Sequence, residues 1–202
     1  MVRQTITTAA AVFLLAGTAA AQSSQRFSVQ LSGLGASLSG DEFEGWGTGT
    51  GFEAQVRYNH SALSIGGGYQ LTKHGLEGID EKLSLGGVFI EPRYVIATNS
   101  NSVAPYVSLR LSMLKESGSV VDDVGDELSL SASGLTFNGG GGVLFRLSRT
   151  INLDLGATWG YTDFGEVTAK FNGTKVPLPD GFDAGSGTNV IFRAGIAIGL
   201  GR

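Results

Sequence analysis

The side chains best suited to acid–base chemistry in this sequence are two histidines, His60 and His74. Histidine changes its charge close to neutral pH, so it can serve as a general base when a carboxylate lies nearby. His74 is followed by Glu77, Asp80 and Glu81, whereas His60 lies in a short polar segment that a turn explains. No serine carries a nucleophile motif, and the sequence therefore favours a protein that is not an enzyme.

An acidic segment and a glycine run are candidates for ligand binding. The segment contains Asp122, Asp123, Asp126 and Glu127, whose oxygens suit calcium, but it lacks the spacing of a calcium loop. A solvated acidic loop is the preferred interpretation. Residues 139–142 are four glycines, but a phosphate-binding loop requires a following helix and a strand pattern follows here. Strand curvature or close packing against a bulky neighbour explains the run better, and no metal or cofactor is predicted.

A larger set of charged residues lies at alternate positions within otherwise apolar segments. The set is Glu53, Arg57, Glu91, Arg93, Arg110, Arg146, Asp154 and Arg193. Two pairs are expected to meet, Glu91 with Arg110 and Arg146 with Asp154. Such a set could form a gate or ion path, or a structural plug of paired charges. The plug is favoured, because a buried pair mainly avoids leaving one charge uncompensated.

The elements that must position these residues are strands, because side chains alternate between apolar and polar with a period of two. The pattern is clearest in residues 107–113, 151–162 and 190–200. The eight predicted strands are 27–38, 51–58, 62–72, 83–97, 103–114, 129–147, 151–164 and 188–200. The sixth is longer than a membrane strand requires, so its first residues are expected to belong to the preceding loop.

The segments between the predicted strands alternate in length. They are residues 39–50, 59–61, 73–82, 98–102, 115–127, 148–150 and 165–187. The four long segments contain 14 of the 18 acidic residues and all five lysines, whereas every arginine lies outside them. Outer-membrane barrels have short periplasmic turns and long extracellular loops, so this pattern predicts that both termini lie in the periplasm.

The composition fits one exported β-rich domain. The chain has 202 residues with 32 glycines, no cysteine and 16% charged residues. Glycine is costly inside helices, so this content disfavours a helical domain. The absence of cysteine excludes disulfides and thiolate metal sites. A net charge of −4 argues against nucleic-acid binding, which needs a basic surface.

The first 21 residues resemble a secretory signal peptide. Arg3 precedes a short apolar stretch at residues 9–16, and residues 19–21 are three alanines of the kind that signal peptidase cleaves after. An uncleaved anchor is the alternative, but the stretch is shorter than the ~20 residues that a spanning helix needs. The prediction is a cleaved signal at 1–21 and a barrel domain at 22–202. No later apolar helix follows, so if that domain lies in a membrane it must span it as a closed barrel.

The outward face of such a barrel is expected to be apolar and the lumen polar. Eight strands leave an interior just wide enough for side chains to fill, so the charged set should occupy the lumen. Aromatic residues near the strand ends predict the two girdles that lie at membrane interfaces. Tyr58, Tyr94 and Phe145 belong to the periplasmic girdle; Tyr69, Trp159 and Tyr161 belong to the outer girdle.

The signal, the eight strands, the alternating loops and the inward charge pairs together resemble the OmpA/OmpX-like small outer-membrane β-barrel family over residues 26–202. The resemblance implies insertion by the barrel assembly machinery, contact with outer-membrane lipid, and a role in envelope integrity, adhesion or host interaction. Two features differ from the family pattern. No peptidoglycan-binding domain follows the last strand, and the chain ends in Gly201-Arg202 rather than in an aromatic residue.

The leading functional hypothesis is a monomeric barrel with a structural or surface-interaction role, whose extracellular loops contact a ligand not identified by the sequence. A narrow channel for small solutes is the first alternative. An outer-membrane lipid-modifying enzyme built around His74, and a soluble periplasmic binding barrel, are the others. Conductance, lipid A analysis and membrane fractionation discriminate among them.

Overall fold

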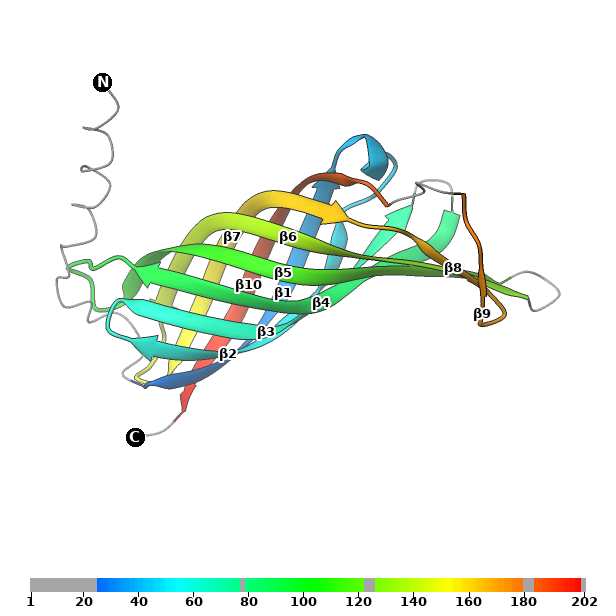
Figure 1. The fold of residues 1–202 in the computed structure, drawn as a ribbon. Helices are drawn as coiled ribbons and strands as arrows, with labels where there is room; N and C mark the ends of the chain where they lie inside the picture. Colours follow the sequence, from blue (N-terminus) through cyan, green and yellow to red (C-terminus); the bar gives the residue numbers. More distant parts are fainter. Residues whose placement is uncertain (1–24, 77–78, 122–125, 180–183, 201–202) are drawn as a thin grey trace, which may run out of the picture.

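Eight long antiparallel strands close into a barrel in the computed structural model, which describes residues 25–76, 79–121, 126–179 and 184–200 (Figure 1). Each strand pairs with its chain neighbours, and β1 closes the ring by pairing with β10. The eight are β1 (Phe27–Ser39), β2 (Gly49–His60), β3 (Leu63–Leu76), β4 (Ile79–Val95), β5 (Val103–Val121), β6 (Glu127–Arg146), β7 (Ile151–Phe164) and β10 (Ser186–Leu200). The predicted all-β, eight-stranded antiparallel up-and-down barrel is confirmed.

The two ends of the barrel differ. Phe27 and Leu200 are opposite each other at one end, which we call the terminal end. At the other, far end, β3, β4, β5 and β6 continue well beyond the rest of the barrel (Figure 1). Long strands therefore replace much of what the sequence predicted as the loops 73–82 and 115–127.

The expectation for the start of the sixth strand was wrong. β6 begins at Glu127, and its first residues pair with β5 on one side and with the short strand β8 (Thr168–Phe171) on the other. Leu128 and Leu130 alternate with serines here, so the segment keeps the period of two that a strand requires. Pairing on both edges satisfies its backbone groups outside the barrel wall.

The long connection between β7 and β10 contains a hairpin that was not predicted from the sequence. β8 pairs with β9 (Thr174–Val176) around Asn172 and Gly173, both of which have positive φ angles, 48° and 81°. An Asn-Gly turn of this kind matches the twist of the two strands and is a strong local hairpin signal. The other unpredicted element is a single 3-10 turn, η2 (Asp41–Phe43), between β1 and β2.

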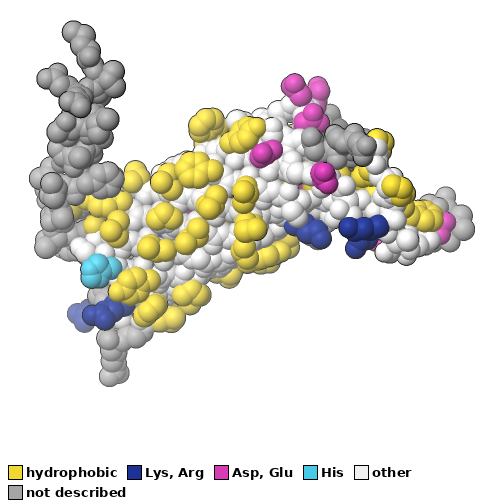
Figure 2. All heavy atoms as spheres, viewed as in Figure 1, with side chains coloured by type: hydrophobic (Ala, Val, Ile, Leu, Met, Phe, Trp, Pro, Cys, Tyr) yellow, Lys and Arg dark blue, Asp and Glu magenta, His cyan; other side chains and the backbone are white. Residues whose placement is uncertain are grey.

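Around its middle, the barrel is apolar outside and polar inside. Figure 2 shows the outward apolar side chains as a broad band. On β5 the outward set is Val107, Leu109, Leu111 and Met113, and the buried set between them is Ser108, Arg110 and Ser112. The alternation of a pleated strand places each set on its own face. Such a band of exposed apolar side chains requires an apolar surrounding.

Beyond this band the alternation continues, but polar side chains face outward and apolar side chains face inward. After Met113 on β5, Lys115 and Ser117 face outward while Leu114 is buried. The inward side chains of the far end form an apolar cluster, which we call the far-end core: Leu38, Phe43, Leu85, Leu114, Ala132 and Phe164, with Trp46, Val167 and Ala184 packed against it. The far end is thus built like a water-soluble domain, with its core inside.

The glycine run at 139–142 allows a close approach inside the barrel. A Cβ atom at Gly142 would lie 2.4 Å from Tyr106 Oη, and one at Gly156 on the neighbouring strand would lie 2.5 Å from the same oxygen. Tyr106 on β5 therefore occupies space that these two glycines leave open. Close packing against a bulky neighbour, one of the two explanations offered by the sequence, is what the structure has at Gly142.

Candidate functional site

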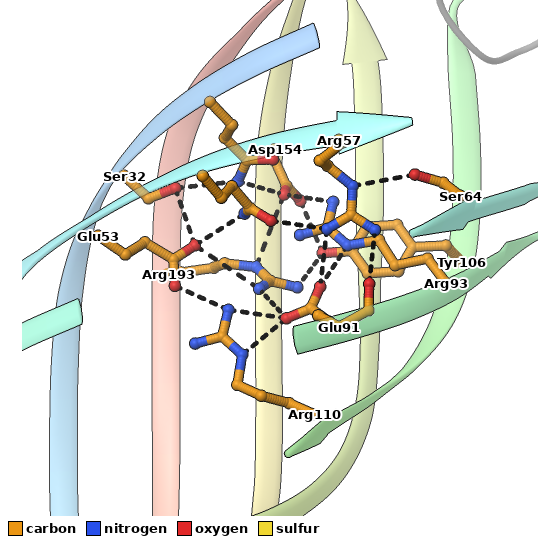
Figure 3. A network of polar contacts seen from close by, with 12 residues as sticks. Ser32, Glu53, Arg57, Ser64, Glu91, Arg93, Tyr106, Arg110, Asp154 and Arg193 are labelled. Carbon is orange, nitrogen blue, oxygen red and sulfur yellow. Dashed lines mark hydrogen bonds and ion pairs between the residues drawn. The ribbon is translucent and has the colours of Figure 1, made fainter. Parts of the chain in front are cut away.

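Seven charged side chains meet inside the barrel at the level of the apolar band, and we call them the lumen cluster (Figure 3). They are Glu53 and Arg57 on β2, Glu91 and Arg93 on β4, Arg110 on β5, Asp154 on β7 and Arg193 on β10. Each is at most 6% exposed. Five strands from all around the ring thus contribute to one site. Its members are far apart in the sequence, so contacts between neighbouring strands are not enough to predict it.

Glu91 is the centre of the lumen cluster, because all four arginines reach its carboxylate. Nη2 of Arg110 and Nη1 of Arg193 each lie 2.7 Å from Oε2. The other oxygen, Oε1, accepts from Nε of Arg93 and lies 3.3 Å from Nη1 of Arg57. The predicted partners Glu91 and Arg110 are therefore brought together, with three further cations around the same carboxylate.

Glu53 and Asp154 complete the network on either side of Glu91. Nη2 of Arg110 lies 2.7 Å from Oε2 of Glu53, so this arginine bridges two carboxylates. Nη1 of Arg93 lies 2.8 Å from Oδ2 of Asp154, and Nε of Arg193 lies 3.6 Å from the same oxygen. The contacts of 2.7 and 2.8 Å belong to the charge-assisted class, the strong class of protein hydrogen bond.

Neutral polar residues that were not predicted as part of the site hold the charged groups in place. Tyr106 donates its hydroxyl hydrogen to Oδ1 of Asp154 at 2.7 Å and accepts from Nη2 of Arg193 at 2.9 Å. Gln30 donates to Oδ2 of Asp154 at 2.7 Å, and Gln70 accepts from Nη1 of Arg110 at 3.0 Å. These residues occupy inward-facing positions of the same period-of-two alternation as the charged residues. That alternation could have predicted their place in the lumen.

The predicted pair between Arg146 and Asp154 is not formed. Arg146 lies at the terminal end of β6, opposite Asn152, and is partly exposed. Asp154 instead contacts Arg93 and Arg193, which approach across the lumen from β4 and β10. A diagonal pairing on neighbouring strands was the expectation, but inside a narrow closed barrel side chains from opposite walls are equally near.

The lumen cluster fills the interior of the barrel at the level of the apolar band. It contains four arginines and three carboxylates, and removing charges from water is offset only where each finds close partners. On its terminal side, the cavity lined by Arg57, Arg93 and Val95 has a volume of about 20 Å³, which is room for about one water molecule. Chemically, the arrangement suits a rigid polar filling.

The two histidines lie apart from the lumen cluster. His60 ends β2 at the terminal end, where its ring stacks on that of Tyr58 at 6.4 Å. His74 is fully buried in the far end. Its Nε2 lies 3.0 Å from Oγ1 of Thr72 and its Nδ1 lies 3.2 Å from the carbonyl oxygen of Gly47. Burial lowers the pKa of His74, with an opposing contribution from the Gly47 hydrogen bond.

His74 therefore lies inside the far-end structure and not at a surface that lipid could reach. Asp80 and Glu81, predicted beside it, belong to β4, but their side chains lie outside what the structure describes. Glu77 lies outside the described residues, as do Asp122 and Asp123 of the acidic segment. Among the described residues, no group of three or more His, Cys, Asp or Glu could hold a metal ion.

The predicted girdle residues lie near the edges of the apolar band, on its outward face. Tyr58, Tyr69, Trp159 and Tyr161 are 42–64% exposed, whereas Tyr94 and Phe145 are partly buried. Tyr58 packs against Phe27 at the terminal end with ring centroids 5.3 Å apart. Oη of Tyr161 donates to Ser186 at 2.6 Å. No helix in the described residues is long and apolar enough to cross a membrane.

A closed antiparallel barrel with an apolar outer band and a charged, filled interior defines the class of transmembrane β-barrel proteins. The family model "Outer membrane protein beta-barrel domain" matches residues 7–198, and the chain belongs to this family. The membrane that it spans is accordingly the outer membrane.

Solved structures of small outer-membrane barrels share the fold. Neisserial surface protein A is 21% identical with a TM-score of 0.61, covering 86% of this chain and 97% of its own. Ail, the attachment invasion locus protein of Yersinia pestis, is 15% identical with a TM-score of 0.51, covering 86% and 97%. A major outer membrane protein from Thermus thermophilus is 14% identical with a TM-score of 0.51, covering 85% and 98%. No curated protein matches the sequence significantly.

Proposed function

We propose that this protein is a non-conducting outer-membrane barrel with a structural and surface-interaction role. The observation that carries the proposal is the contrast between a lumen filled by the lumen cluster and a far end whose strands continue beyond the apolar band. A filled interior leaves no path for solutes, whereas extended strands provide surface for contacts. The far end faces the cell exterior and both termini face the periplasm.

Planar-bilayer recording on the refolded protein tests the closed lumen. The expected result is no steady open state. The double variant Glu53→Ser/Arg110→Ser is the matched control, because it removes a contacting pair together, leaves the net charge of the lumen cluster unchanged and leaves space in the lumen. A steady conductance of the unmodified protein would favour the channel for small solutes instead.

Cysteine labelling tests the orientation, since the chain has no cysteine of its own. Lys175→Cys places a thiol on exposed β9 at the far end, and Ser148→Cys places one in an exposed turn at the terminal end. A membrane-impermeant maleimide should label Lys175→Cys in intact cells and Ser148→Cys only after lysis. The reverse pattern would invert the proposed orientation.

The surface role depends on the hairpin of β8 and β9 and on its neighbours. Ail is the attachment invasion locus protein of Yersinia pestis, and that name motivates an adhesion assay for this chain. Cells that express the protein should adhere to cultured host cells better than cells in which residues 168–176 are replaced by a short Gly-Ser linker. Equal adhesion by equally abundant, heat-modifiable barrels would remove the surface-interaction role.

The remaining parts of the proposal concern assembly. We propose that a signal at residues 1–21 is cleaved, that the barrel assembly machinery inserts the chain, and that it is a monomer. The signal lies outside the described residues. Mass spectrometry should show that the mature protein begins at Gln22. Depletion of the barrel assembly machinery should leave unfolded chain in the periplasm. Analytical ultracentrifugation in detergent should give one chain per particle.

A further inference from the structure

All five lysines of the chain lie on one outward sheet surface at the far end, which we call the lysine face. They are Lys73 on β3, Lys82 on β4, Lys115 on β5, Lys170 on β8 and Lys175 on β9, and each is exposed. Register joins them: Lys73 is opposite Ser84, Lys115 is opposite Ser133, and Lys170 is opposite Ser129 and Lys175. Figure 2 shows basic side chains directly beyond the apolar band, with acidic side chains grouped along the other edge.

Serines fill the lysine face between its cations. Ser117 lies opposite both Ser84 and Ser131, and Ser119 lies opposite Ser129. Together with Lys82, Lys115 and Lys170 they line a hollow of about 340 Å³, and Glu127 is the one carboxylate in its lining among the described residues. Ammonium and hydroxyl groups are the donors that phosphate oxygens and sugar hydroxyls accept from.

The cations of the lysine face are available for a ligand. Among the described residues, no lysine forms an ion pair with a carboxylate. The nearby inward carboxylate, Glu116, projects to the other side of β5 and lines the far-end interior. In the described lining of the hollow, three lysines lie with the single carboxylate of Glu127, so positive charge is in excess and an anionic partner would relieve the repulsion between the lysines.

An apolar hollow of about 490 Å³ adjoins the lysine face, and Lys115 lines both. Its lining includes Tyr69, Val88, Met113 and Leu135, which belong to the outward apolar band. Gly86 lies opposite Lys115, and Oη of Tyr69 occupies the space that a side chain at Gly86 would fill. A ligand bound across both hollows would place an apolar chain against the band and an anionic head on the lysines and serines.

From these two adjoining hollows we infer that the far end binds a phosphorylated glycolipid of the outer leaflet, with its acyl chain against the apolar hollow and its phosphates and sugars on the lysine face. The serine-lined surface from Lys115 to Ser119 spans four residues, or about 13 Å along a strand. That length exceeds one phosphate group and suits a phosphorylated sugar head. The inference rests on the proposed orientation, since only the outward-facing end meets this leaflet.

The test measures binding of fluorescent lipid A to the refolded protein in detergent micelles. Binding should weaken about five-fold when one lysine is neutralised, and on the order of a hundred-fold in Lys82→Gln/Lys115→Gln/Lys170→Gln, since each surface lysine near an anionic lipid contributes about equally. Arg149→Gln, a charge removed from the exposed turn at the terminal end, is the matched control and should bind as the unmodified protein does. Heat-modifiable migration verifies that every variant is folded.

Two further probes distinguish the source of the anion. Dephosphorylated lipid A should bind far more weakly than lipid A, and glucosamine 1-phosphate, which has no acyl chain, should compete only weakly. Equal binding of dephosphorylated lipid A, or an equal loss in Arg149→Gln, would overturn the inference. Full competition by glucosamine 1-phosphate would overturn it in favour of a soluble phosphate ligand. Because micelles have no sides, these outcomes are independent of the orientation that cysteine labelling reports.

Discussion

The apolar band and the far end are built from the same strands with the same alternation, but their two faces exchange chemistry. In the band, Leu109 faces outward and Arg110 is buried; a few residues on, Lys115 faces outward and Leu114 is buried. The difference teaches that the medium around a strand decides which face is apolar. Lipid surrounds the band and water surrounds the far end, and the crossover lies between Met113 and Lys115.

The two regions are also stabilised differently. The far-end core gains stability by removing apolar side chains from water, as a soluble domain does. Within the band, the outward apolar side chains stay in contact with lipid, and the interior contains ion pairs and hydrogen bonds. Removing one partner from the interior should therefore disturb the whole ring, whereas a substitution at the far end should act locally.

The largest effect is expected from Glu91→Gln, which removes the carboxylate shared by four arginines. Breaking a buried ion pair by removing one partner costs about 3–5 kcal/mol, because the remaining charges are left uncompensated. Urea unfolding of the refolded barrel, followed by heat-modifiable migration, measures the loss. The control is Glu44→Gln on the exposed far end, where the change should be within about 0.5 kcal/mol. Similar losses of unfolding free energy in the two variants would contradict the claim that the two regions are stabilised differently.

A lysine placed on either side of the crossover sharpens the comparison next. Leu109→Lys introduces a charge into the middle of the outward apolar band and should destabilise the barrel by about 2–4 kcal/mol in lipid vesicles. Ser117→Lys introduces the same charge two residues beyond Lys115 and should be nearly neutral. Unfolding in vesicles measures both, and a costly Ser117→Lys would move the membrane boundary towards the far end.

A smaller effect is expected from Tyr106→Phe, which deletes one hydroxyl from the lumen. The loss of its hydrogen bonds to Asp154 and Arg193 should cost about 1–3 kcal/mol, since both partners are charged. Tyr58→Phe, on the exposed outer face, is the matched control and should change the unfolding free energy little. If both variants unfold at the same urea concentration, Tyr106 fills space without supporting the ion pairs.

The smallest effect concerns pH and is confined to the far end. Burial lowers the pKa of His74 below its ordinary value of 6.5, so the folded protein takes up this proton less readily than the unfolded chain does. Stability of the far end is therefore unaffected well above pH 6.5 and decreases as the pH falls from 6.5 towards the folded-state pKa.

Trp46 reports this change, because its ring centre lies 5.5 Å from that of His74. With Trp159→Phe in the background, Trp46 is the one remaining tryptophan, and its fluorescence should change with a midpoint below pH 6.5. His74→Gln should abolish the transition, whereas Glu116→Gln, in the same far-end interior, should leave it in place. A transition that persists in His74→Gln would contradict the assignment.

Most of the fold could be predicted from the alternation of apolar and polar residues along the chain. The period of two located the eight strands to within a few residues, except at the far end, where β4 and β5 continue well beyond their predicted limits. Loop-like composition, with many acidic residues and glycines, hid that continuation. Asn172-Gly173 is a local signal for the hairpin of β8 and β9, but it lies within a long polar segment that was predicted as a loop.

The candidate site was predictable only in part. Alternation assigned Glu53, Glu91 and Arg110 to the interior, but it did not show that Glu91 collects four arginines or that Arg146 stays at the rim. Those outcomes depend on distances across the lumen between strands far apart in the chain. The five lysines could be counted in the sequence, but their common face follows from the register of β3, β4, β5, β8 and β9.

The sequence by itself determined the strands, their closure into a membrane barrel and the side chains that point inward, because each follows from alternation along one strand. Tertiary structure alone decided which charges meet, where the apolar and polar faces exchange, and which cations share a surface. The physical reason is that partners across a barrel are set by the register between strands and by distances across the lumen, and neither is written in the spacing of neighbouring residues.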